Sequence, residues 1–579
     1  MKDNQHQKNK NTFYDICTNS FQQVPYKWQV EVGNTILQAY YQNKSICQLL
    51  VRPTGGGKSL VFTASAACIK GITLSIMPLL TLGSNQFENL INKTESDHSI
   101  TAFHLDELTK EEVENTLFPK LLMLSSKKTV ILFTSPQCIL HRCNNIIEKL
   151  IALKLIHFVV VDEIHLFNHF GRSFRKEFTA LKESIFQKIE NHNTPILLMT
   201  ATCTQEIRKS IEKMIGITIT NTHWPGAKNM KHRKISLDLH YTNQALAYVL
   251  KSIKQPITSN EELGNKVIIY SNSAKGIVDY ANRLGNEFDN DDDLHNIDIV
   301  TITGRMKREQ KAEYLRTFLD ENIQGNDINL RVLCSTSGVG NAGIDSPDIR
   351  AVYRIDFPPS VVDICQERGR AGRRSDALPT THWYKLLFSL ESFLYLFKRI
   401  HDPQEKDLSN DYRAILLNDL LAVTGFICSN RCYVLQLEEK MGNPFVKYES
   451  STEDSCGFCT NCIGKKNFPI LQKQSTCNML FDLFVAGDNK IDVEYTYENV
   501  MEAIVNYPSI NKVLFGSRQT KIEPVKIKKF ILLMIGFTII KLKYREKDDQ
   551  VMFELTTSSE ENFSLAMNDE FCWKYIHTK

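Results

Sequence analysis

The sequence predicts an α/β protein with two consecutive lobes, each built around a parallel sheet, followed by a smaller C-terminal region. Short apolar runs recur between residues 21 and 400, and each ends in a polar or turn cluster. This pattern is typical of buried parallel strands joined by crossover helices. At 579 residues the chain is too long for one hydrophobic core. After residue 395 the pattern changes to helices and then to a cluster of cysteines.

The predicted strands fall into two sets. The first lobe covers residues 21–222 and follows a tail, residues 1–20, that we expect to be disordered. Its strands are Ile46–Val51, Thr73–Met77, Val130–Thr134, Phe158–Val161 and Ile196–Met199. The second lobe covers residues 223–400, and its strands are Lys266–Tyr270, Ile297–Ile302, Arg331–Cys334 and Ala351–Ile355.

Two smaller units are expected after the lobes. Residues 401–466 contain helical stretches and the cysteine cluster, and they form the predicted zinc-binding module. In residues 467–579, helical stretches precede the strand-like runs Thr538–Lys543 and Val551–Thr556, which the polar turn Arg545–Asp549 joins. Helices followed by a hairpin predict a winged-helix-like domain.

The bulk composition is that of an ordinary globular protein, with 42% hydrophobic and 23% charged residues. No apolar run reaches the ~20 residues needed to cross a membrane, and the polar N-terminus lacks the apolar core of a signal peptide. We therefore expect an intracellular protein with no membrane partner. The net charge is only +3, but residues 512–547 hold eight Lys and two Arg against two Glu. This basic segment suits either contact with a duplex backbone or a solvated lysine face around an apolar core.

The segment from Pro53 to Ser59 reads Pro-Thr-Gly-Gly-Gly-Lys-Ser and predicts a phosphate-binding loop. Its glycines let backbone N–H groups wrap around phosphate oxygens, and a strand before it and a helix-like run after it supply the expected context. Lys58 is expected on the β- and γ-phosphates, and the Ser59 hydroxyl on Mg²⁺. The expected nucleotide contacts are Thr54, Gly55, Gly56, Gly57, Lys58 and Ser59. The general pattern has glycine where Arg52 stands.

Two further segments fit phosphate chemistry. Asp162 and Glu163 end an apolar strand, which in a parallel sheet places them beside the phosphate-binding loop. Asp162 is expected to hold Mg²⁺ through its water shell, and Glu163 to orient the attacking water. Far along the chain, Gln366–Arg374 is a glycine-spaced arginine cluster that predicts a second surface for the same phosphates.

The loop that follows Asp162 alternates aromatic and basic residues. Aromatic faces stack on unpaired bases and arginines contact phosphates, so the loop is predicted to bind single-stranded nucleic acid. The residues expected to do so are Phe167, His169, Phe170, Arg172, Phe174 and Arg175. For Phe174 and Phe178, packing in the core is the alternative.

These segments occur in the order found in the RecQ helicases of superfamily 2, which the chain resembles over residues 21–465. Asp162–Arg175 resembles that family's Asp-Glu box and aromatic loop, and Pro53–Ser59 its phosphate loop. Other segments resemble its further motifs in order: Met77–Leu82, Thr134–Gln137, Thr200–Thr202, Gly338–Asp345 with Pro347–Arg350, and Gln366–Arg373. The sequence departs from the family at Phe170, where Trp is usual, and at Arg354, where His is usual.

The resemblance implies two RecA-like lobes and an ATP-dependent DNA helicase. Such an enzyme moves 3′→5′ on single-stranded DNA and unwinds partly duplex DNA. The resemblance places Gln29 at the adenine edge, and Thr200 and Thr202 in the coupling of ATP hydrolysis to domain movement. It makes Arg373 the arginine finger, which neutralises charge in the transition state.

Gln366 and Arg370 are implied to support that finger. The implied cofactors are ATP, Mg²⁺ and a structural Zn²⁺, and the implied location is the nucleus. No protein partner is predicted.

Most of the fifteen cysteines lie singly in apolar segments and are expected to be small buried hydrophobic residues: Cys68, Cys138, Cys203 and Cys334. Cys456, Cys459 and Cys462 instead stand at metal-ligand spacing. Cys432 lies in a segment that resembles the family's first zinc-ligand segment, which implies a closed Cys₄ site for Zn²⁺. Cys428, one helical turn before it, is an alternative fourth ligand. Reduced cysteines without a metal are the other alternative.

Two other readings of the function remain open. One is an RNA helicase, or a translocase that moves on DNA without unwinding it. The other, of a different class, is a zinc and winged-helix DNA-binding adaptor with a vestigial ATPase. Lys58, Asp162, Glu163 and Arg373 are all present, which argues against the adaptor.

Overall fold

The computed structural model describes residues 13–52, 56–77, 83, 86–88, 90–92, 99–165, 180–201, 203, 205–224, 235–257, 265–290, 297–320, 330–336, 344, 346–372, 382–402, 410–429, 431–441, 452, 454–464, 495–496, 524–536, 540–545, 547 and 550–555. The chain divides into two compact units. The first is Met1–His232 with Glu438–Val446, and the second is Arg233–Leu437 with Lys447–Lys579.

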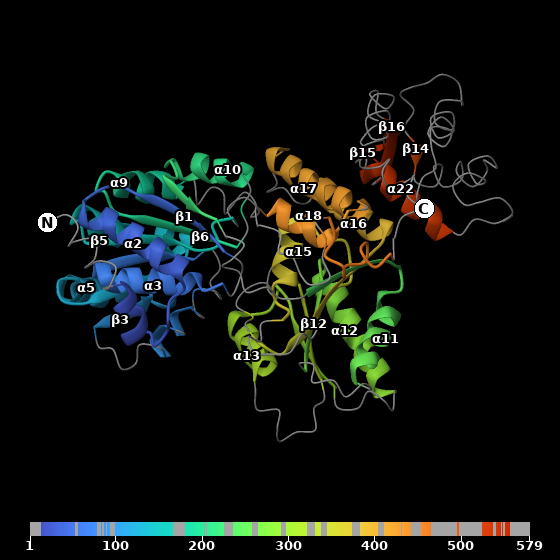
Figure 1. Cartoon of the computed structure of the whole chain (residues 1–579), viewed down its shortest axis with the longest axis horizontal. Coiled ribbons are helices and arrows are strands. Elements are labelled where there is room, and N and C mark those ends of the chain that lie inside the picture. The colour runs from blue at the N-terminus through green and yellow to red at the C-terminus, as the bar shows by residue number, and fades with distance from the viewer. Residues whose placement is uncertain are drawn as a thin grey trace. The chain divides into compact units, whose positions relative to one another are not determined.

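The first unit contains a seven-stranded sheet in the order β3-β4-β2-β5-β6-β1-β7, and all neighbouring strands are parallel (Figure 1). Its strands are β1 (Cys47–Val51), β2 (Gly71–Ile76), β3 (Ile100–His104), β4 (Thr129–Thr134), β5 (Ile156–Val161), β6 (Ile196–Thr200) and β7 (Asn221–His223). Its helices are α2 (Lys27–Tyr41), α3 (Lys58–Ile69), η2 (Glu112–Leu117), α5 (Phe118–Leu124), η3 (Cys138–Arg142), α6 (Asn144–Ala152), η4 (Lys182–Phe186), α9 (Gln187–Glu190) and α10 (Gln205–Ile215).

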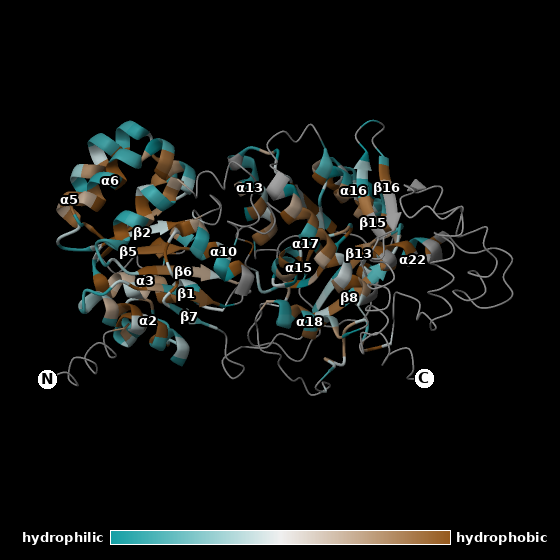
Figure 2. Ribbon diagram, turned by 90° about the horizontal axis from the view of Figure 1, so that it is seen from above, coloured by the Kyte–Doolittle hydropathy of each residue, from teal (hydrophilic) through white to brown (hydrophobic). Residues whose placement is uncertain are grey.

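Both faces of this sheet are buried. Successive residues of a strand point to opposite faces, so Val159 and Val161 join one hydrophobic cluster while Phe158 and Val160 join another. The strands accordingly appear as almost continuous hydrophobic ribbons in Figure 2. This double burial explains why the strands could be recognised in the sequence as unbroken apolar runs.

The second unit contains a six-stranded parallel sheet in the order β10-β11-β9-β12-β13-β8. Its strands are β8 (Ile235–Tyr241), β9 (Lys266–Ser271), β10 (Ile297–Ile302), β11 (Leu330–Thr336), β12 (Ile349–Arg354) and β13 (His382–Phe388). Its helices are α11 (Ala245–Ile257), α12 (Ala274–Asp289), α13 (Arg308–Leu319), α15 (Val361–Arg368), α16 (Leu390–His401), α17 (Asn410–Cys428) and, reaching the border between the units, α18 (Tyr433–Lys440). Ser360 caps α15 by accepting a hydrogen bond from the Asp363 backbone N–H.

The C-terminal part of this unit carries α22 (Pro524–Gly536) and an antiparallel hairpin of β15 (Ile540–Arg545) and β16 (Gln550–Leu555), with β14 (Tyr495–Thr496) beside β16. The predicted hairpin is therefore confirmed. A Cβ at Gly536 would lie 3.1 Å from the Cys428 Sγ, so glycine permits α22 to approach α17 closely.

Two lysines of the basic segment contact their own unit. Lys528 pairs with Glu391, and the Lys529 Nζ lies 5.4 Å from the centroid of the Tyr241 ring. Burial lowers the pKa of Lys529. These two charges therefore contact the unit that carries α22, while both side chains stay partly exposed.

Every strand predicted for the two lobes overlaps an observed one, and Cys68, Cys138, Cys203 and Cys334 are buried as expected. The strands β3, β7, β8 and β13 were not predicted. Among the described residues, no helix is both long enough and apolar enough to span a membrane.

Candidate active site

The phosphate-binding loop lies between β1 and α3. Gly57 precedes the first residue of α3 and has φ +88°, a left-handed conformation that suits glycine. Lys58 begins α3, is buried, and donates a hydrogen bond from Nζ to the Arg52 carbonyl at 3.0 Å. Ser59 is exposed on the first turn. Backbone N–H groups at a helix N-terminus favour anions, so this end of α3 can hold phosphate.

Gln29 connects α2 to this loop. Its Nε2 donates to the Gly57 carbonyl at 2.8 Å, and its Oε1 accepts from the Tyr26 backbone N–H at 2.6 Å. The side chain is only 2% exposed. The Gln29 amide keeps one hydrogen and one lone pair that could bind an adenine edge. The expected base contact therefore requires Gln29 to bind the loop and the base at the same time.

The strand order brings the predicted acids next to the loop. The strands β5, β6 and β1 are neighbours in the sheet, and they end at Val161, Thr200 and Val51. Because parallel strands share one carboxyl edge, Asp162 and Thr200 lie at the same edge as the phosphate-binding loop. Glu163 follows with φ +45°, a strained conformation of the kind found at functional sites.

Asp162 is buried and hydrogen-bonded at both carboxylate oxygens. Oδ2 accepts from the Gln86 Nε2 at 2.6 Å, and Oδ1 accepts from the Glu163 backbone N–H at 2.8 Å. Burial and the neighbouring Glu163 raise the pKa of Asp162 to about 6, although Lys58 opposes the shift. A cation at this carboxylate would compensate its buried charge, which fits the expected Mg²⁺ site.

His165 links the acids to Thr200. Its Nδ1 lies 2.8 Å from the Thr200 Oγ1 and 3.3 Å from the Glu163 Oε2, and His165 and Thr200 are fully buried. A change at Glu163 can therefore reach β6 through one imidazole, which suits the coupling role expected of Thr200. The sequence analysis assigned no role to His165 or Gln86. His165 lies in the segment Asp162–Arg175, and Gln86 follows the segment Met77–Leu82.

Arg52, which stands where the general loop pattern has glycine, is enclosed by the first unit. Its guanidinium carbon lies 4.4 Å from the centroid of the Trp28 ring, and its Nη2 lies 3.0 Å from the His223 Nδ1. Burial lowers the pKa of Arg52 to about 10. The side chain therefore points away from the loop it precedes, while its carbonyl accepts from Lys58.

Gln366 and Arg370 lie in the second unit, on and just after α15. Arg370 is 6% exposed and donates from Nη1 to the Ile344 carbonyl at 2.9 Å. Gly372 then turns the chain with φ +63° immediately before Arg373. Arg370 thus holds the turn that precedes the predicted finger, which is consistent with a supporting role.

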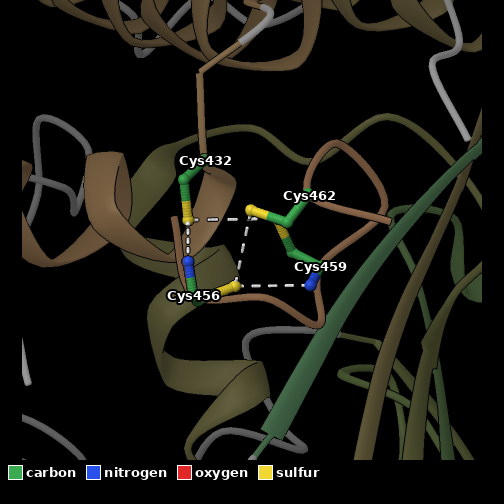
Figure 3. A group of neighbouring side chains, drawn as sticks. All are labelled: Cys432, Cys456, Cys459 and Cys462. Atoms are coloured by element: carbon green, nitrogen blue, oxygen red, sulfur yellow. Dashed lines mark hydrogen bonds between the residues drawn. The ribbon is translucent and has the colours of Figure 1, made fainter. Parts of the chain in front are cut away.

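The four predicted zinc ligands converge (Figure 3). Their sulfur atoms all lie within 4.8 Å of one another, with separations of 3.4 Å for Cys459–Cys462, 3.8 Å for Cys456–Cys462 and 4.0 Å for Cys432–Cys459. Tetrahedral Zn²⁺ with Zn–S bonds of ~2.3 Å requires sulfur separations of about 3.8 Å. The cysteines therefore fit a tetrahedral metal ion.

The surroundings of these sulfurs also suit thiolates. The Cys432 Sγ accepts from the backbone N–H groups of Leu435 and Cys456, at 3.4 and 3.3 Å. Hydrogen bonds among the four thiols lower the pKa of Cys459 to about 7 and raise that of Cys456. Because these shifts oppose one another, a bound cation would be needed to hold all four sulfurs as thiolates.

Cys428, the alternative fourth ligand, lies apart from this group. Its thiol faces the Leu532 carbonyl of α22 at 3.6 Å, and burial raises its pKa. The alternative is therefore wrong, because the helical turn that separates Cys428 from Cys432 directs its side chain toward the α17–α22 contact.

Several predicted residues lie outside the described part of the chain. They are Thr54 and Gly55 of the phosphate-binding loop, Thr202, Arg373, and the aromatic-loop residues Phe167, His169, Phe170, Arg172, Phe174 and Arg175. Their expected roles stay predictions.

Two family models match the chain, one on each sheet. The DEAD/DEAH box helicase model matches residues 27–210, and the Helicase conserved C-terminal domain model matches residues 244–375. The chain is 26% identical over 431 residues to the RecQ-like DNA helicase BLM of Xenopus laevis, covering 72% of this chain and 28% of that protein. It is 26% identical over 415 residues to the ATP-dependent DNA helicase RecQ of Haemophilus influenzae, covering 71% and 58%.

A third relative is similar over nearly all of the chain. It is the ATP-dependent helicase SGS1 of Saccharomyces cerevisiae, 27% identical over 561 residues, which cover 95% of this chain and 34% of that protein. The chain thus spans less than two thirds of the length of these relatives. Together with the site geometry, the matches in both halves place a DEAD/DEAH box helicase domain and a helicase C-terminal domain in this chain, which is similar to RecQ-family DNA helicases.

Proposed function

We propose that this protein is an ATP-dependent DNA helicase. It couples ATP hydrolysis to 3′→5′ translocation on single-stranded DNA and to duplex unwinding. The observation that carries the proposal is the shared carboxyl edge of β1, β6 and β5. This edge brings Lys58, Asp162 and Thr200 together from distant parts of the sequence. A protein that only binds DNA would have no use for this arrangement, because a buried carboxylate with a raised pKa costs stability.

Each part of the reaction has its own residues in this chain. The α3 N-terminus and Lys58 bind the phosphates of ATP. Gln29 holds the Gly57 end of the loop and contacts the adenine base. Asp162 and Ser59 are the groups that would hold Mg²⁺, which supplies charge neutralisation at the β- and γ-phosphates. Glu163 orients the attacking water, and Arg373 serves as the arginine finger with Gln366 and Arg370 behind it.

The zinc and C-terminal assignments belong to the same proposal. Cys432, Cys456, Cys459 and Cys462 would hold Zn²⁺. The metal would crosslink a segment whose hydrophobic core is small, and so help it to fold. Residues 467–579 would act as a winged-helix-like domain on duplex DNA, and the aromatic loop would bind the single strand. The lobes would follow the boundaries predicted above, except that residues 13–19 form a helix with Phe13 and Cys17 in the core of the first unit, so the prediction of a disordered tail over residues 1–20 is wrong for them. The enzyme would act in the nucleus.

The first experiment is steady-state ATP hydrolysis by the full chain, alone, with single-stranded DNA, and with single-stranded RNA. We expect DNA to stimulate turnover and RNA to do so much less. Lys58→Ala should lower kcat by roughly 10²–10³-fold, because the lysine contacts charge that develops on the phosphates. Lys127→Ala, which removes an exposed lysine of the same unit, should leave kcat unchanged.

Unwinding is then tested on duplexes with a 3′ or a 5′ single-stranded tail. Strand separation only on the 3′-tailed duplex is the expected result. Stimulation by RNA alone would assign the chain to RNA. DNA-stimulated hydrolysis without strand separation would make it a translocase, and no hydrolysis under any condition would favour the adaptor.

A further inference from the structure

A completely buried guanidinium lies at the end of β12, outside every role assigned so far. Arg354 has no exposed surface, and it donates to three acceptors. Its Nε contacts the Asp356 Oδ1 at 2.6 Å, its Nη1 contacts the Glu367 Oε1 at 2.6 Å, and its Nη2 contacts the Asn272 Oδ1. The three nitrogen atoms of the planar guanidinium therefore each donate to a different residue.

Each acceptor is fixed by a second contact. The Asp356 Oδ2 accepts from the Asn272 backbone N–H at 2.7 Å, and the Asn272 Nδ2 donates to the Phe357 carbonyl at 2.7 Å. The Glu367 Oε2 accepts from the Tyr384 hydroxyl on β13 at 2.9 Å. The guanidinium thus joins the ends of β9 and β12 to α15, and Glu367 joins α15 to β13.

The electrostatics require this cation. Glu367 is fully buried, and burial raises its pKa to about 7 while Arg354 acts in the opposite direction. Asp356 lies on the other side of the guanidinium and pairs with it as well. Without Arg354, the buried Glu367 carboxylate would lose the cation that it pairs with, and the partly exposed Asp356 would lose the same partner.

The helix held in this way is the one that leads to the predicted finger. Glu367 follows Gln366 on α15, and the chain continues through Arg370 and the Gly372 turn to Arg373. Successive helical residues point about 100° apart, so anchoring Glu367 inward fixes the direction of Gln366. We infer that Arg354 is a positioning residue that sets the orientation of residues 366–372, which include Gln366 and Arg370. This inference rests on the proposed ATPase function.

The test compares two buried arginines of the same sheet in the full chain. Arg354→Met removes the positioning contact. Arg331→Met is the matched control, because Arg331 is 6% exposed and pairs with Asp298 on β10 at 2.9 Å, away from α15. We expect Arg354→Met to lower kcat on the order of 10²-fold, the size of effect that a small misplacement of a catalytic group produces.

Nucleotide binding separates positioning from general damage. The ATP-binding residues lie in the other unit, so the Kd of a nonhydrolysable ATP analogue should change by less than about twofold in Arg354→Met. Arg354→Lys keeps the charge but not the fork, so it should recover part of the kcat. An unchanged kcat in Arg354→Met, or an equal loss in Arg331→Met, would overturn the inference.

Amide hydrogen exchange gives a readout that does not require turnover. In Arg354→Met, exchange should accelerate in α15, and in Arg331→Met it should not. A wild-type chain that hydrolyses no ATP would refute the proposed function. In that case, unchanged exchange in α15 of Arg354→Met would separately refute the positioning role, and faster exchange would support it.

Discussion

Replacing Asp162 by Asn should stabilise the first unit at alkaline pH while it abolishes ATP hydrolysis. The carboxyl is 3% exposed, and its pKa is raised from 3.8 to about 6 by burial and by Glu163. A raised carboxyl pKa means that the native state binds the proton more tightly than the unfolded chain does. The stability that this group contributes is therefore complete below its unfolded pKa and is lost as the pH rises through about 6.

The magnitude follows from the shift. From 3.8 to about 6 is roughly 2 pKa units, and each unit is worth about 1.4 kcal/mol. Ionising Asp162 should therefore cost the native state about 3 kcal/mol at pH 8. At pH 4.5 the cost should be only about 1 kcal/mol, because the native carboxyl is still protonated.

Asparagine is expected to avoid this cost because the site can adapt to its amide. The Gln86 Nε2 now donates to the Asp162 Oδ2 at 2.6 Å, and within the described residues the buried Gln86 Oε1 has no hydrogen-bond partner. Rotation of the Gln86 amide by 180° would let that oxygen accept from the new Nδ2. The substitution should then leave no buried donor facing another donor.

The assay is differential scanning calorimetry of the nucleotide-free and Mg²⁺-free protein at pH 8 and pH 4.5. For a unit of this size, about 3 kcal/mol corresponds to a Tm gain of roughly 6–12 °C at pH 8, with about a third of that at pH 4.5. Asp15→Asn, at an exposed position of the same unit, should show no such difference. Destabilisation at pH 8, or an equal shift at both pH values, would refute the electrostatic reasoning.

Further predictions concern the loop and the cysteine cluster. Gly57→Ala adds a Cβ that would lie 2.7 Å from the Gln29 Nε2 in a left-handed backbone, so nucleotide affinity should fall by about 1–3 kcal/mol in a fluorescent-nucleotide titration. Wild-type affinity would show that the loop is not held by Gln29. Cys459→Ser should lose its metal and lower the free energy of unfolding, whereas Cys428→Ser should keep full metal content by elemental analysis. Full metal in Cys459→Ser would contradict the Cys₄ site.

The strands that the sequence predicted, except β10, are buried on both faces. β5 ends in the apolar run Phe158–Val161 and β6 begins with the apolar run Ile196–Met199, so their burial is evident without knowledge of the fold. β8 reads Ile-Ser-Leu-Asp-Leu-His-Tyr and β13 carries Lys385 in its middle, so neither has an unbroken apolar run. Their place in the sheet depends on neighbours far along the chain.

The same limit applies to the candidate site. Lys58, Asp162 and the cysteine ligands were recognisable because each belongs to a short segment with its own spacing. Gln86 reaches Asp162 across 76 positions, and Arg354 meets Asn272 across 82. Which residues become partners depends on which strand ends lie next to each other in the sheet. No local pattern in the sequence shows this strand order.

The cysteine cluster has a consequence for the sheet beside it. β8 is the edge strand of the second sheet, with β13 on one side only. The loop that carries the cysteines lies along its other side. There the Thr460 backbone N–H donates to the Leu237 carbonyl at 3.2 Å, and the Leu239 backbone N–H donates to the Thr460 Oγ1 at 2.8 Å.

An open edge is a template on which another chain can add a strand. The Thr460 contacts cover part of this edge, so we expect loss of the cysteine cluster to expose β8 to pairing with another chain. Chelation should produce soluble aggregates rich in intermolecular β-structure before the sheet itself unfolds.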